Sequence, residues 1–299
     1  MSNFILTFSF LLIGFLLKHS KQFPEQTAQV LNLFVIYVSL PALILLNIPQ
    51  LEFTDDLAVV VVIPWLILVI SVLLVLFFSK LFNWDRQTLA VLLLLVPLGN
   101  TSFLGIPMVQ AYYGKQAVAY ALIYDQFGSF FALALYGSII LALYNEESKG
   151  FSLKVVIHKI LIFPPFIALL TAILYSFFET SLMLTKVITP LAETLVPVVM
   201  VAVGYQLQLS IDRKHISAFI VGLSLKMIAA PFIVALLLYG FEIKRVIYQV
   251  TIFESAMPPM ISVGALAIMS GFNAKLTAAM LAYGILFAFI SLPILHMLI

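Results

Sequence analysis

Long apolar runs alternate with short polar gaps along the whole chain. A helix needs about 20 apolar residues to cross the hydrocarbon core of a bilayer, and most of the runs reach that length. When the runs are divided at their polar breaks, the pattern predicts ten membrane-spanning helices. They lie at residues 3–17, 27–47, 57–79, 88–112, 115–144, 154–177, 184–207, 215–239, 245–271 and 275–298. The sequence therefore predicts an all-α polytopic membrane protein.

The composition agrees with a membrane protein and excludes several other classes. Hydrophobic residues make up 64% of the chain and charged residues 9%, far from the composition of soluble domains. The 15 basic and 13 acidic residues are scattered in the gaps, so no basic stripe exists for nucleic acid. There is no cysteine, and no two of the four histidines have metal-ligand spacing on one helix. We expect no cofactor, no metal and no nucleic-acid partner.

The longest polar gap follows the fifth span and divides the chain into halves of nearly equal length. We expect residues 1–145 and 154–299 each to form a five-helix repeat, joined by a short cytoplasmic linker at 146–153. An odd number of spans per half places the second repeat upside down, which is a common plan for secondary transporters. Prolines recur in corresponding spans, as the pairs Pro41 and Pro197, Pro64 and Pro231, and Pro107 and Pro258.

The basic residues predict the orientation of the chain, because cytoplasmic loops carry an excess of Lys and Arg. Ten lie in the gaps after odd-numbered spans: Lys18, Lys21, Lys80, Arg86, Lys149, Lys154, Lys159, Arg213, Lys214 and Lys275. Four lie on the other side: Lys115, Lys186, Lys244 and Arg245. We therefore expect a multi-pass protein of the cell (inner or plasma) membrane with both termini extracytoplasmic.

Spans four and nine are predicted to break near mid-membrane. Span four reads PLGNTSFLGIP from Pro97 to Pro107, and span nine reads ESAMPPMIS from Glu254 to Ser262. Each proline removes a backbone donor, and glycine permits unusual dihedral angles. Irregular backbone at this depth persists only when it is buried in protein or lines a wet cavity. Two such segments at corresponding places in inverted halves indicate a transport site, whereas the isolated prolines are expected to be plain kinks.

Four ionisable residues stand inside predicted spans, where each charge costs at least ~2.5 kcal/mol. Glu254, one turn before the prolines of span nine, could carry a proton, bind sodium with the freed carbonyls, or serve as a structural partner of Lys226 or of backbone amides. Asp125 is placed in the same polar network. Lys226 could neutralise an acid, attract an anion or reach the inner headgroups. Glu193 is expected at the outer interface as a structural group.

The run GNTSFLGIP from Gly99 to Pro107 resembles the Asn-Thr-x-x-x-Gly-Ile-Pro element of the auxin efflux carrier family, which includes plant PIN carriers and bacterial malate or malonate permeases. Three other stretches are similar to helices two, seven and nine of that family. They are LNLFVIYVSLPAL from Leu31 to Leu43, Pro197 to Gly204 with Leu207, and Ala256 to Pro259. The resemblance spans the whole chain, although the long central loop of the plant members is absent.

The resemblance implies a fold like that of sodium/proton antiporters and bile-acid symporters, in which broken helices four and nine cross. It also implies a scaffold of spans one, two, six and seven, a transport domain of spans three to five and eight to ten, and homodimers through the scaffold. By carry-over, Asn100 would hydrogen-bond a substrate carboxylate at the crossing, and Pro107 and Pro258 would shape that region. Thr101, Ser102, Ala256 and Met257 complete the expected substrate site.

We therefore expect a secondary transporter of small organic anions that works by alternating access. The substrate is expected to be an auxin-like monocarboxylate or a small dicarboxylate. Transport without coupling, with a proton or with sodium all remain open, as does the direction. The alternatives are a membrane sensor that binds ligand without flux and an intramembrane enzyme, although the acidic residues lack the paired settings of such enzymes. No Walker motif for a built-in ATPase is present.

Overall fold

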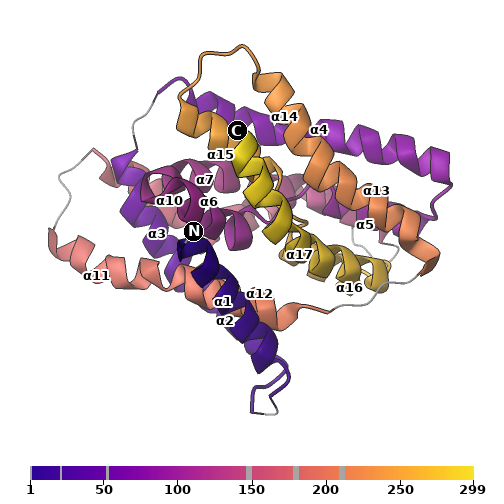
Figure 1. Cartoon of the computed structure of the whole chain (residues 1–299), viewed down its shortest axis with the longest axis horizontal. Coiled ribbons are helices and arrows are strands. Elements are labelled where there is room, and N and C mark those ends of the chain that lie inside the picture. Colours follow the sequence, from indigo (N-terminus) through magenta and orange to yellow (C-terminus); the bar gives the residue numbers. More distant parts are fainter. Residues whose placement is uncertain (1, 21, 52–53, 146–149, 178–181, 209–212) are drawn as a thin grey trace. The chain divides into compact units, whose positions relative to one another are not determined.

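The computed structural model describes residues 2–20, 22–51, 54–145, 150–177, 182–208 and 213–299 (Figure 1). Every regular element in these ranges is a helix, and their only bridge between extended segments joins Gly99 to Pro259. The all-α prediction is confirmed. The expected linker at 146–153 falls partly outside the description, since residues 146–149 are not among these ranges.

Six helices, some built from consecutive helical elements, are long and apolar enough to cross a membrane by length and composition. They are Thr27–Gln50, Leu57–Phe82, Lys115–Tyr144, Met183–Gln206, Ile216–Leu238 and Ala274–Leu298. A bent pair, Leu153–Leu161 with Pro164–Tyr175, would make a seventh span. The remaining predicted spans are occupied by shorter helices, so the count of ten belongs to the proposal below.

The chain divides into two units, each built from separated segments. The first unit comprises Met1–Asp55, Ser102–Leu122 and Ile157–Leu207, and the second comprises Asp56–Thr101, Ile123–Val156 and Gln208–Ile299. In chain order, the elements within or mainly within the first unit are α1 (Ser2–Leu17), α2 (Thr27–Phe34), η1 (Val35–Ser39), α3 (Leu40–Asn47), η2 (Ile48–Gln50), η3 (Thr101–Gly105), α6 (Ile106–Tyr113), η4 (Lys115–Ala117), α7 (Val118–Ile123), α9 (Leu153–Leu161), α10 (Pro164–Tyr175), α11 (Leu182–Glu193) and α12 (Leu195–Gln206).

Helices α1 and α12 of the first unit pack backbone to backbone. A side chain added at Gly14 would overlap the backbone of Val201, and one added at Gly204 would overlap the carbonyl of Leu11. Small residues allow such close approach between helices in membranes, where packing replaces the hydrophobic drive for association. The two glycines therefore set the distance between the first and the last helix of this unit.

The second unit contains the remaining elements. They are α4 (Leu57–Phe82), α5 (Arg86–Leu95), η5 (Tyr124–Phe130), η6 (Leu133–Gly137), α8 (Ser138–Tyr144), η7 (Arg213–His215), α13 (Ile216–Ser224), η8 (Leu225–Ala229), α14 (Ala230–Leu238), α15 (Arg245–Ser255), α16 (Ile261–Met269) and α17 (Ala274–Leu298).

Helix α5 is the centre of the second unit. Its residues from Ala90 to Leu95 are all buried, in a cluster that takes side chains from α4, α8, α13, α16 and α17. The side chain of Asp85 caps its start by accepting a hydrogen bond of 2.8 Å from the backbone N–H of Thr88. The helix ends before Pro97, which has no N–H to donate. A helix that is apolar on all sides thus leads directly into the first irregular segment.

Both predicted breaks are present. Regular α-helix is absent from residues 96–100 and from residues 256–260, and the chain continues beyond them as η3 and α6 and as α16. The first interval holds Pro97 and Gly99, and the second holds Pro258 and Pro259; the prolines have no backbone donor. The sequence therefore located the two interruptions correctly.

Span six differs from the expected continuous helix. The sixth consists of α9 and α10, which are bent by 61°. The cause is the pair Pro164–Pro165 at the start of α10, which holds the preceding Phe163 in an extended conformation. The seventh span, Met183–Gln206, continues through the junction of α11 and α12 at Thr194, whose backbone stays in the right-handed helical region.

Candidate functional site

The two irregular segments of the second unit pair with each other in antiparallel fashion. The backbone N–H of Asn100 donates to the carbonyl of Pro258 at 2.8 Å, and that of Met260 donates to the carbonyl of Leu98 at 3.0 Å. Gly99 and Pro259 lie opposite each other at the centre of this bridge. The bridge uses no N–H from the central residues, so a proline is tolerated there. The pairing satisfies backbone groups that a broken helix would otherwise leave open.

Asn100 presents an unused donor at this pairing. Its side chain is buried, and its Nδ2 atom has no hydrogen-bond partner within the described ranges. Buried polar groups are almost always hydrogen-bonded, so such an atom calls for an explanation. A carboxamide N–H suits an acceptor such as a carboxylate oxygen.

Asp125 lies next to the first irregular segment and is held by neighbouring side chains. Its Oδ1 accepts a hydrogen bond of 2.5 Å from the hydroxyl of Thr101, and its Oδ2 accepts one of 2.8 Å from Nε2 of Gln126. All three side chains are buried. Asp125 belongs to the π-helical segment η5, and such segments are frequent at functional sites.

Lys226 places its ammonium between Gly99 of the first irregular segment and the carboxyl end of α15, directly before the second. Its Nζ donates to the carbonyl of Ser255 at 3.4 Å, and it lies 2.9 Å from where a β-carbon of Gly99 would stand. Lys226 belongs to another π-helical segment, η8, and its side chain is buried. The carbonyl of Ser255 is at the carboxyl end of α15, where the helix dipole favours a cation.

Glu254 is the least satisfied group of this cluster. It is fully buried, and neither carboxyl oxygen has a hydrogen-bond partner in the part of the chain that the structure describes. It interacts electrostatically with Asp125 and Lys226. A cavity of about 10 Å³, room for about one water molecule, is lined by Glu254, Lys226 and Thr101 among others. This cluster can hold a proton, a water molecule or a small ion.

The predicted site residues do not all fall in one unit. Asn100, Thr101, Asp125, Lys226 and Glu254 are brought together in the second unit, with the buried residues Ala256, Met257 and Pro258 in its other irregular segment. Ser102, which is half-buried, and Pro107, which is buried in α6, belong to the first unit. Pro107 lines a different and larger pocket there.

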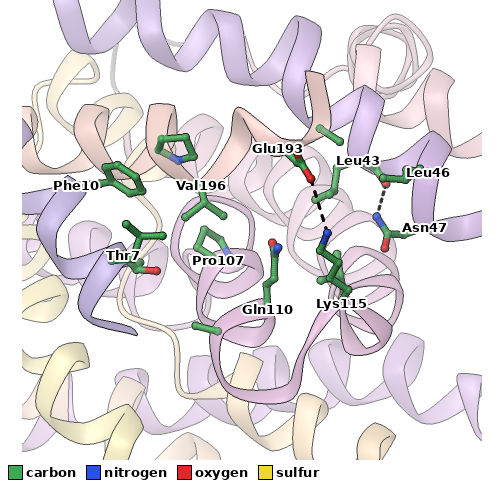
Figure 2. Close-up of a pocket in the computed structure, with 15 residues that line it drawn as sticks. Thr7, Phe10, Leu43, Leu46, Asn47, Pro107, Gln110, Lys115, Glu193 and Val196 are labelled. Atoms are coloured by element: carbon green, nitrogen blue, oxygen red, sulfur yellow. Dashed lines mark hydrogen bonds and ion pairs between the residues drawn. The ribbon is translucent and has the colours of Figure 1, made fainter. Parts of the chain in front are cut away.

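That pocket, called here the first-unit pocket, has a volume of about 400 Å³ (Figure 2). Its lining residues come from α1, α3, α6, η4, α7, α11 and α12, and all of them belong to the first unit. The walls are mostly apolar, and Thr7, Asn47 and Gln110 contribute neutral polar groups. Small-molecule sites typically have such walls and volumes of this size.

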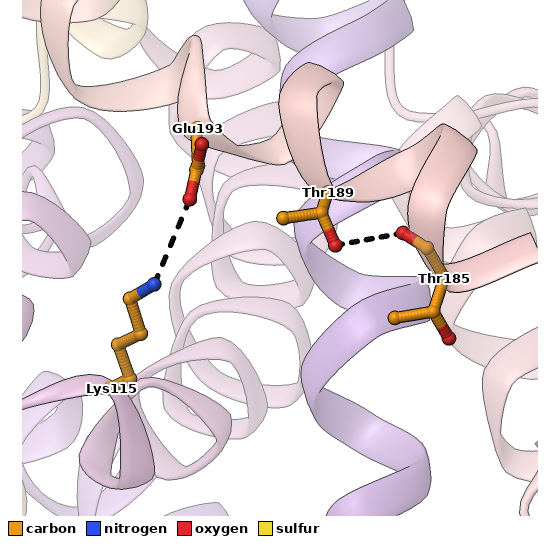
Figure 3. A network of polar contacts seen from close by, with 4 residues as sticks. All are labelled: Lys115, Thr185, Thr189 and Glu193. Atoms are coloured by element: carbon orange, nitrogen blue, oxygen red, sulfur yellow. Dashed lines mark hydrogen bonds and ion pairs between the residues drawn. The ribbon is translucent and has the colours of Figure 1, made fainter. Parts of the chain in front are cut away.

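An ion pair lies at this pocket. Lys115 Nζ and Glu193 Oε1 are 3.7 Å apart, and the two side chains are 78% and 62% exposed (Figures 2 and 3). Lys115 follows Gly114, whose φ of +82° turns the chain at the end of α6. Glu193 ends α11, one turn after Thr189, whose hydroxyl donates to the carbonyl of Thr185 at 2.7 Å (Figure 3).

The sequence interpretation missed this pair. It placed Lys115 and Glu193 at the same outer side of the membrane, which is a signal that they could meet, but it assigned Glu193 a structural role at the interface. The pocket itself leaves no mark in the sequence, because its lining residues come from segments far apart in the chain.

A helical protein with several apolar spans and a polar, buried pairing of two broken helices has the features of a membrane transporter. The profile of a family described as membrane transport protein matches residues 1–296. The chain therefore belongs to this family, the auxin efflux carriers, and the resemblance found at Gly99 to Pro107 is confirmed. The protein is a multi-pass membrane protein and a transporter rather than an enzyme.

Two archaeal relatives are similar over nearly their full lengths. An uncharacterized transporter of Methanocaldococcus jannaschii is 26% identical over 277 residues, which cover 90% of this chain and 88% of the relative. An uncharacterized transporter of Methanothermobacter thermautotrophicus is 22% identical over 286 residues, 95% of this chain and 93% of the relative. Neither name specifies a substrate.

Proposed function

We propose that this transporter moves small organic anions by alternating access and binds the substrate carboxylate at the paired irregular segments. The observation that carries the proposal is the buried Nδ2 of Asn100, which has no partner within the described ranges. A donor kept free of internal partners in a membrane transporter is available to an acceptor that arrives with the substrate. Thr101, Ala256, Met257 and Pro258, all in the second unit, are proposed to complete the substrate site.

The helix ends at this pairing support an anionic substrate. Helix α16 begins at Ile261, directly after the irregular segment, and the first N–H groups of a helix lack intrahelical partners. These groups and the helix dipole favour negative charge at that end. The opposite charge preference, at the carboxyl end of α15, is already served by the ammonium of Lys226. The amino end of α16 thus favours an anion, and the carboxyl end of α15 favours a cation.

The cluster of Glu254, Asp125 and Lys226 is the proposed place for a coupling cation. Two carboxyl groups and one ammonium leave one negative charge when all are ionised, and a single proton or sodium ion balances it. No coupling ion is required for efflux, because a potential negative inside favours the exit of an anion by ~2.3 kcal/mol per charge per 100 mV. Uptake of an anion against this potential requires a coupling ion.

The wider topology is part of the same proposal. Ten spans in two inverted five-helix repeats, with helices four and nine crossing, accommodate the two breaks and the paired prolines. The excess of basic residues in one set of gaps supports extracytoplasmic termini in a cytoplasmic membrane. Homodimers through spans one, two, six and seven follow from the family resemblance.

The test is counterflow of a labelled carboxylate in vesicles that contain the purified full-length protein. We expect saturable exchange of either an aromatic monocarboxylate or a small dicarboxylate, and its loss in Asn100→Ala. The matched control is Gln50→Ala, which removes an exposed amide and should leave exchange unchanged. Exchange that persists in Asn100→Ala would contradict the assigned site. Binding without counterflow would instead favour the sensor hypothesis, and sodium or pH dependence abolished by Glu254→Gln would identify the coupling ion.

A further inference from the structure

We propose that a second pocket, built around Arg86 in the second unit, binds a phosphate ester. This Arg86 pocket has a volume of about 340 Å³. Residues 86–87, 144–145 and 269–272 line it, and all of them belong to the second unit. None of these residues is part of the paired irregular segments, so the inference is independent of the transport substrate and of its site.

Arg86 is held in place but keeps most of its donors free. Its Nη2 donates to the carbonyl of Leu143 at 2.8 Å, and its Cζ lies 5.6 Å from the centre of the Tyr144 ring. The side chain is exposed, and its other N–H groups have no partner among the described residues. A guanidinium that is fixed in this way can donate to two oxygens of one phosphate group at once.

The charges at the Arg86 pocket fit an anion. Arg86 is the one charged residue of the described lining, and Gln87 and Ser270 add neutral polar groups that can donate hydrogen bonds. The carboxylate of the preceding Asp85 is not part of the lining. It accepts hydrogen bonds from the backbone N–H and the hydroxyl of Thr88 at the start of α5. The pocket therefore has a cation that no described acidic residue in its lining neutralises.

The helix ends at the pocket favour an ester over a bare phosphate ion. Tyr144 is the last residue of α8 and Met269 the last of α16, and both line the pocket. The carboxyl end of a helix carries partial negative charge and favours donors and cations. A phosphate joined to an alcohol that has its own hydroxyl or ammonium groups can satisfy Arg86 and these helix ends together. The volume also lies in the range of sites for whole small molecules.

The position of the pocket in the chain points to the headgroup layer of the membrane. Its three segments lie at or next to the gaps after predicted spans three, five and nine, which share one side of the membrane in the proposed topology. Trp84 stacks on Phe82 at 5.7 Å two residues before Arg86, and tryptophan is enriched at the level of the headgroups. Met269 is 83% exposed and gives the pocket an apolar edge. Phospholipid headgroups and soluble phosphate esters both reach such a place.

Two probes with the same phosphate ester chemistry distinguish these sources. Dioctanoyl phosphatidylglycerol represents the lipid and glycerol phosphate the soluble ester. Binding of each to the detergent-purified full chain is measured by titration calorimetry. We expect at least one probe to bind the wild type, and Arg86→Met to weaken that binding about tenfold or more. Arg86→Lys keeps the charge without the planar fork and should recover only part of the loss.

A second variant tests the charge of the pocket without removing Arg86. Gln87→Glu adds a carboxylate to the lining at the second residue of α5, where a negative charge stabilises the helix. The fold is therefore retained, and binding should weaken about tenfold or more. Lys80→Met is the matched control, because it removes an exposed cation of α4 that does not line the pocket. The melting temperature without ligand shows that each variant is folded.

The pattern of binding decides the outcome. Binding of the lipid probe alone assigns the pocket to a membrane phospholipid, and binding of glycerol phosphate shows that a soluble ester suffices. The inference is overturned if neither probe binds the wild type, or if Arg86→Met or Gln87→Glu binds as tightly as the wild type. Equal binding of dioctanoylglycerol, which has the same tails without the phosphate, would also overturn it.

Discussion

The hydroxyl of Thr101 donates a hydrogen bond of 2.5 Å to Oδ1 of Asp125, and this contact ties the residue that follows the first irregular segment to the π-helical turn of the next span. Both residues are buried, and the acceptor is a carboxylate at membrane depth. Hydrogen bonds to charged groups contribute more than neutral ones, and a carboxylate that loses a donor in such a place bears a desolvation penalty.

We therefore expect Thr101→Val to lower the free energy of unfolding by about 1.5–3 kcal/mol. Valine has nearly the shape of threonine, so packing changes little and the lost donor dominates. Thr101→Ser keeps the hydroxyl and should recover most of the loss. Thermal unfolding of the purified variants measures both, and equal melting temperatures for Thr101→Val and the wild type would show that the contact contributes nothing.

Lys226 and Glu254 should behave as a coupled pair. Removal of one charge from a buried pair costs about 3–5 kcal/mol, because the remaining charge loses its partner. We expect Lys226→Met to destabilise the protein strongly, and the double variant with Glu254→Gln to be more stable than the sum of the single effects predicts. A double-mutant cycle by thermal unfolding gives the coupling energy. Additive effects would mean that the two groups do not sense each other.

The close packing of α1 on α12 predicts a sharp response to small side chains. Gly204→Ala places a methyl group on the carbonyl oxygen of Leu11, a backbone atom that cannot move without the helix. We expect a loss of about 1–3 kcal/mol in stability. Gly137→Ala is the matched control, because its methyl group would meet only the flexible ends of two side chains, Leu133 at 3.1 Å and Leu98 at 3.9 Å. Similar melting temperatures for the two variants would contradict this account of the helix contact.

Asp85 should give a pH-dependent contribution to stability outside the membrane-spanning segments. Burial acts to raise the pKa of its carboxyl, but hydrogen bonds from Thr88 and attraction to His215 outweigh it and hold the pKa below its ordinary value of 3.8. The contribution is therefore complete above that value and disappears as the pH falls through the lowered pKa.

Two substitutions at Asp85 separate its charge from its capping role. Asp85→Asn keeps a good helix cap without the charge, so its melting temperature should lack the decrease that Asp85 adds as the pH falls below about 4 and through the lowered pKa of this carboxyl. Asp85→Ala loses the cap as well and should cost about 1 kcal/mol at pH 7. Identical pH profiles for the wild type and Asp85→Asn would exclude this role.

Much of the local structure follows from the sequence because it depends on local chemistry. The apolar runs that predicted helices are helical in the structure. The prolines and Gly99 lie at the two positions where the helices are interrupted. The burial of Asp125, Lys226 and Glu254 also agrees with their place in apolar runs. The contacts of these residues with Thr101, Ser255 and the irregular backbone could be seen only in the structure, because the partners are distant in the chain.

Other features were beyond a reading of local pattern. The proline pair Pro164–Pro165 is a sequence signal for the bend in span six. The prediction missed it because it was based on the length of the apolar run alone. The π-helical turns that hold Asp125 and Lys226 have no amino-acid composition that distinguishes them from ordinary α-helix. The first-unit pocket depends on how α1, α3, α6, α11 and α12 leave space between them, and no single segment encodes that space.

The bridge at Gly99 and Pro259 also fixes the order in which the nascent chain can mature. The amide of Asn100 gains its backbone partner only after Pro258 has left the ribosome, and the carbonyl of Leu98 only after Met260 has done so. Until then, the inserted amino-terminal half holds open polar backbone at a depth where each unsatisfied group costs several kcal/mol. Chains that end before this point keep these backbone groups unsatisfied and are therefore less stable. Cellular proteases should remove them faster than chains that include α15 and α16.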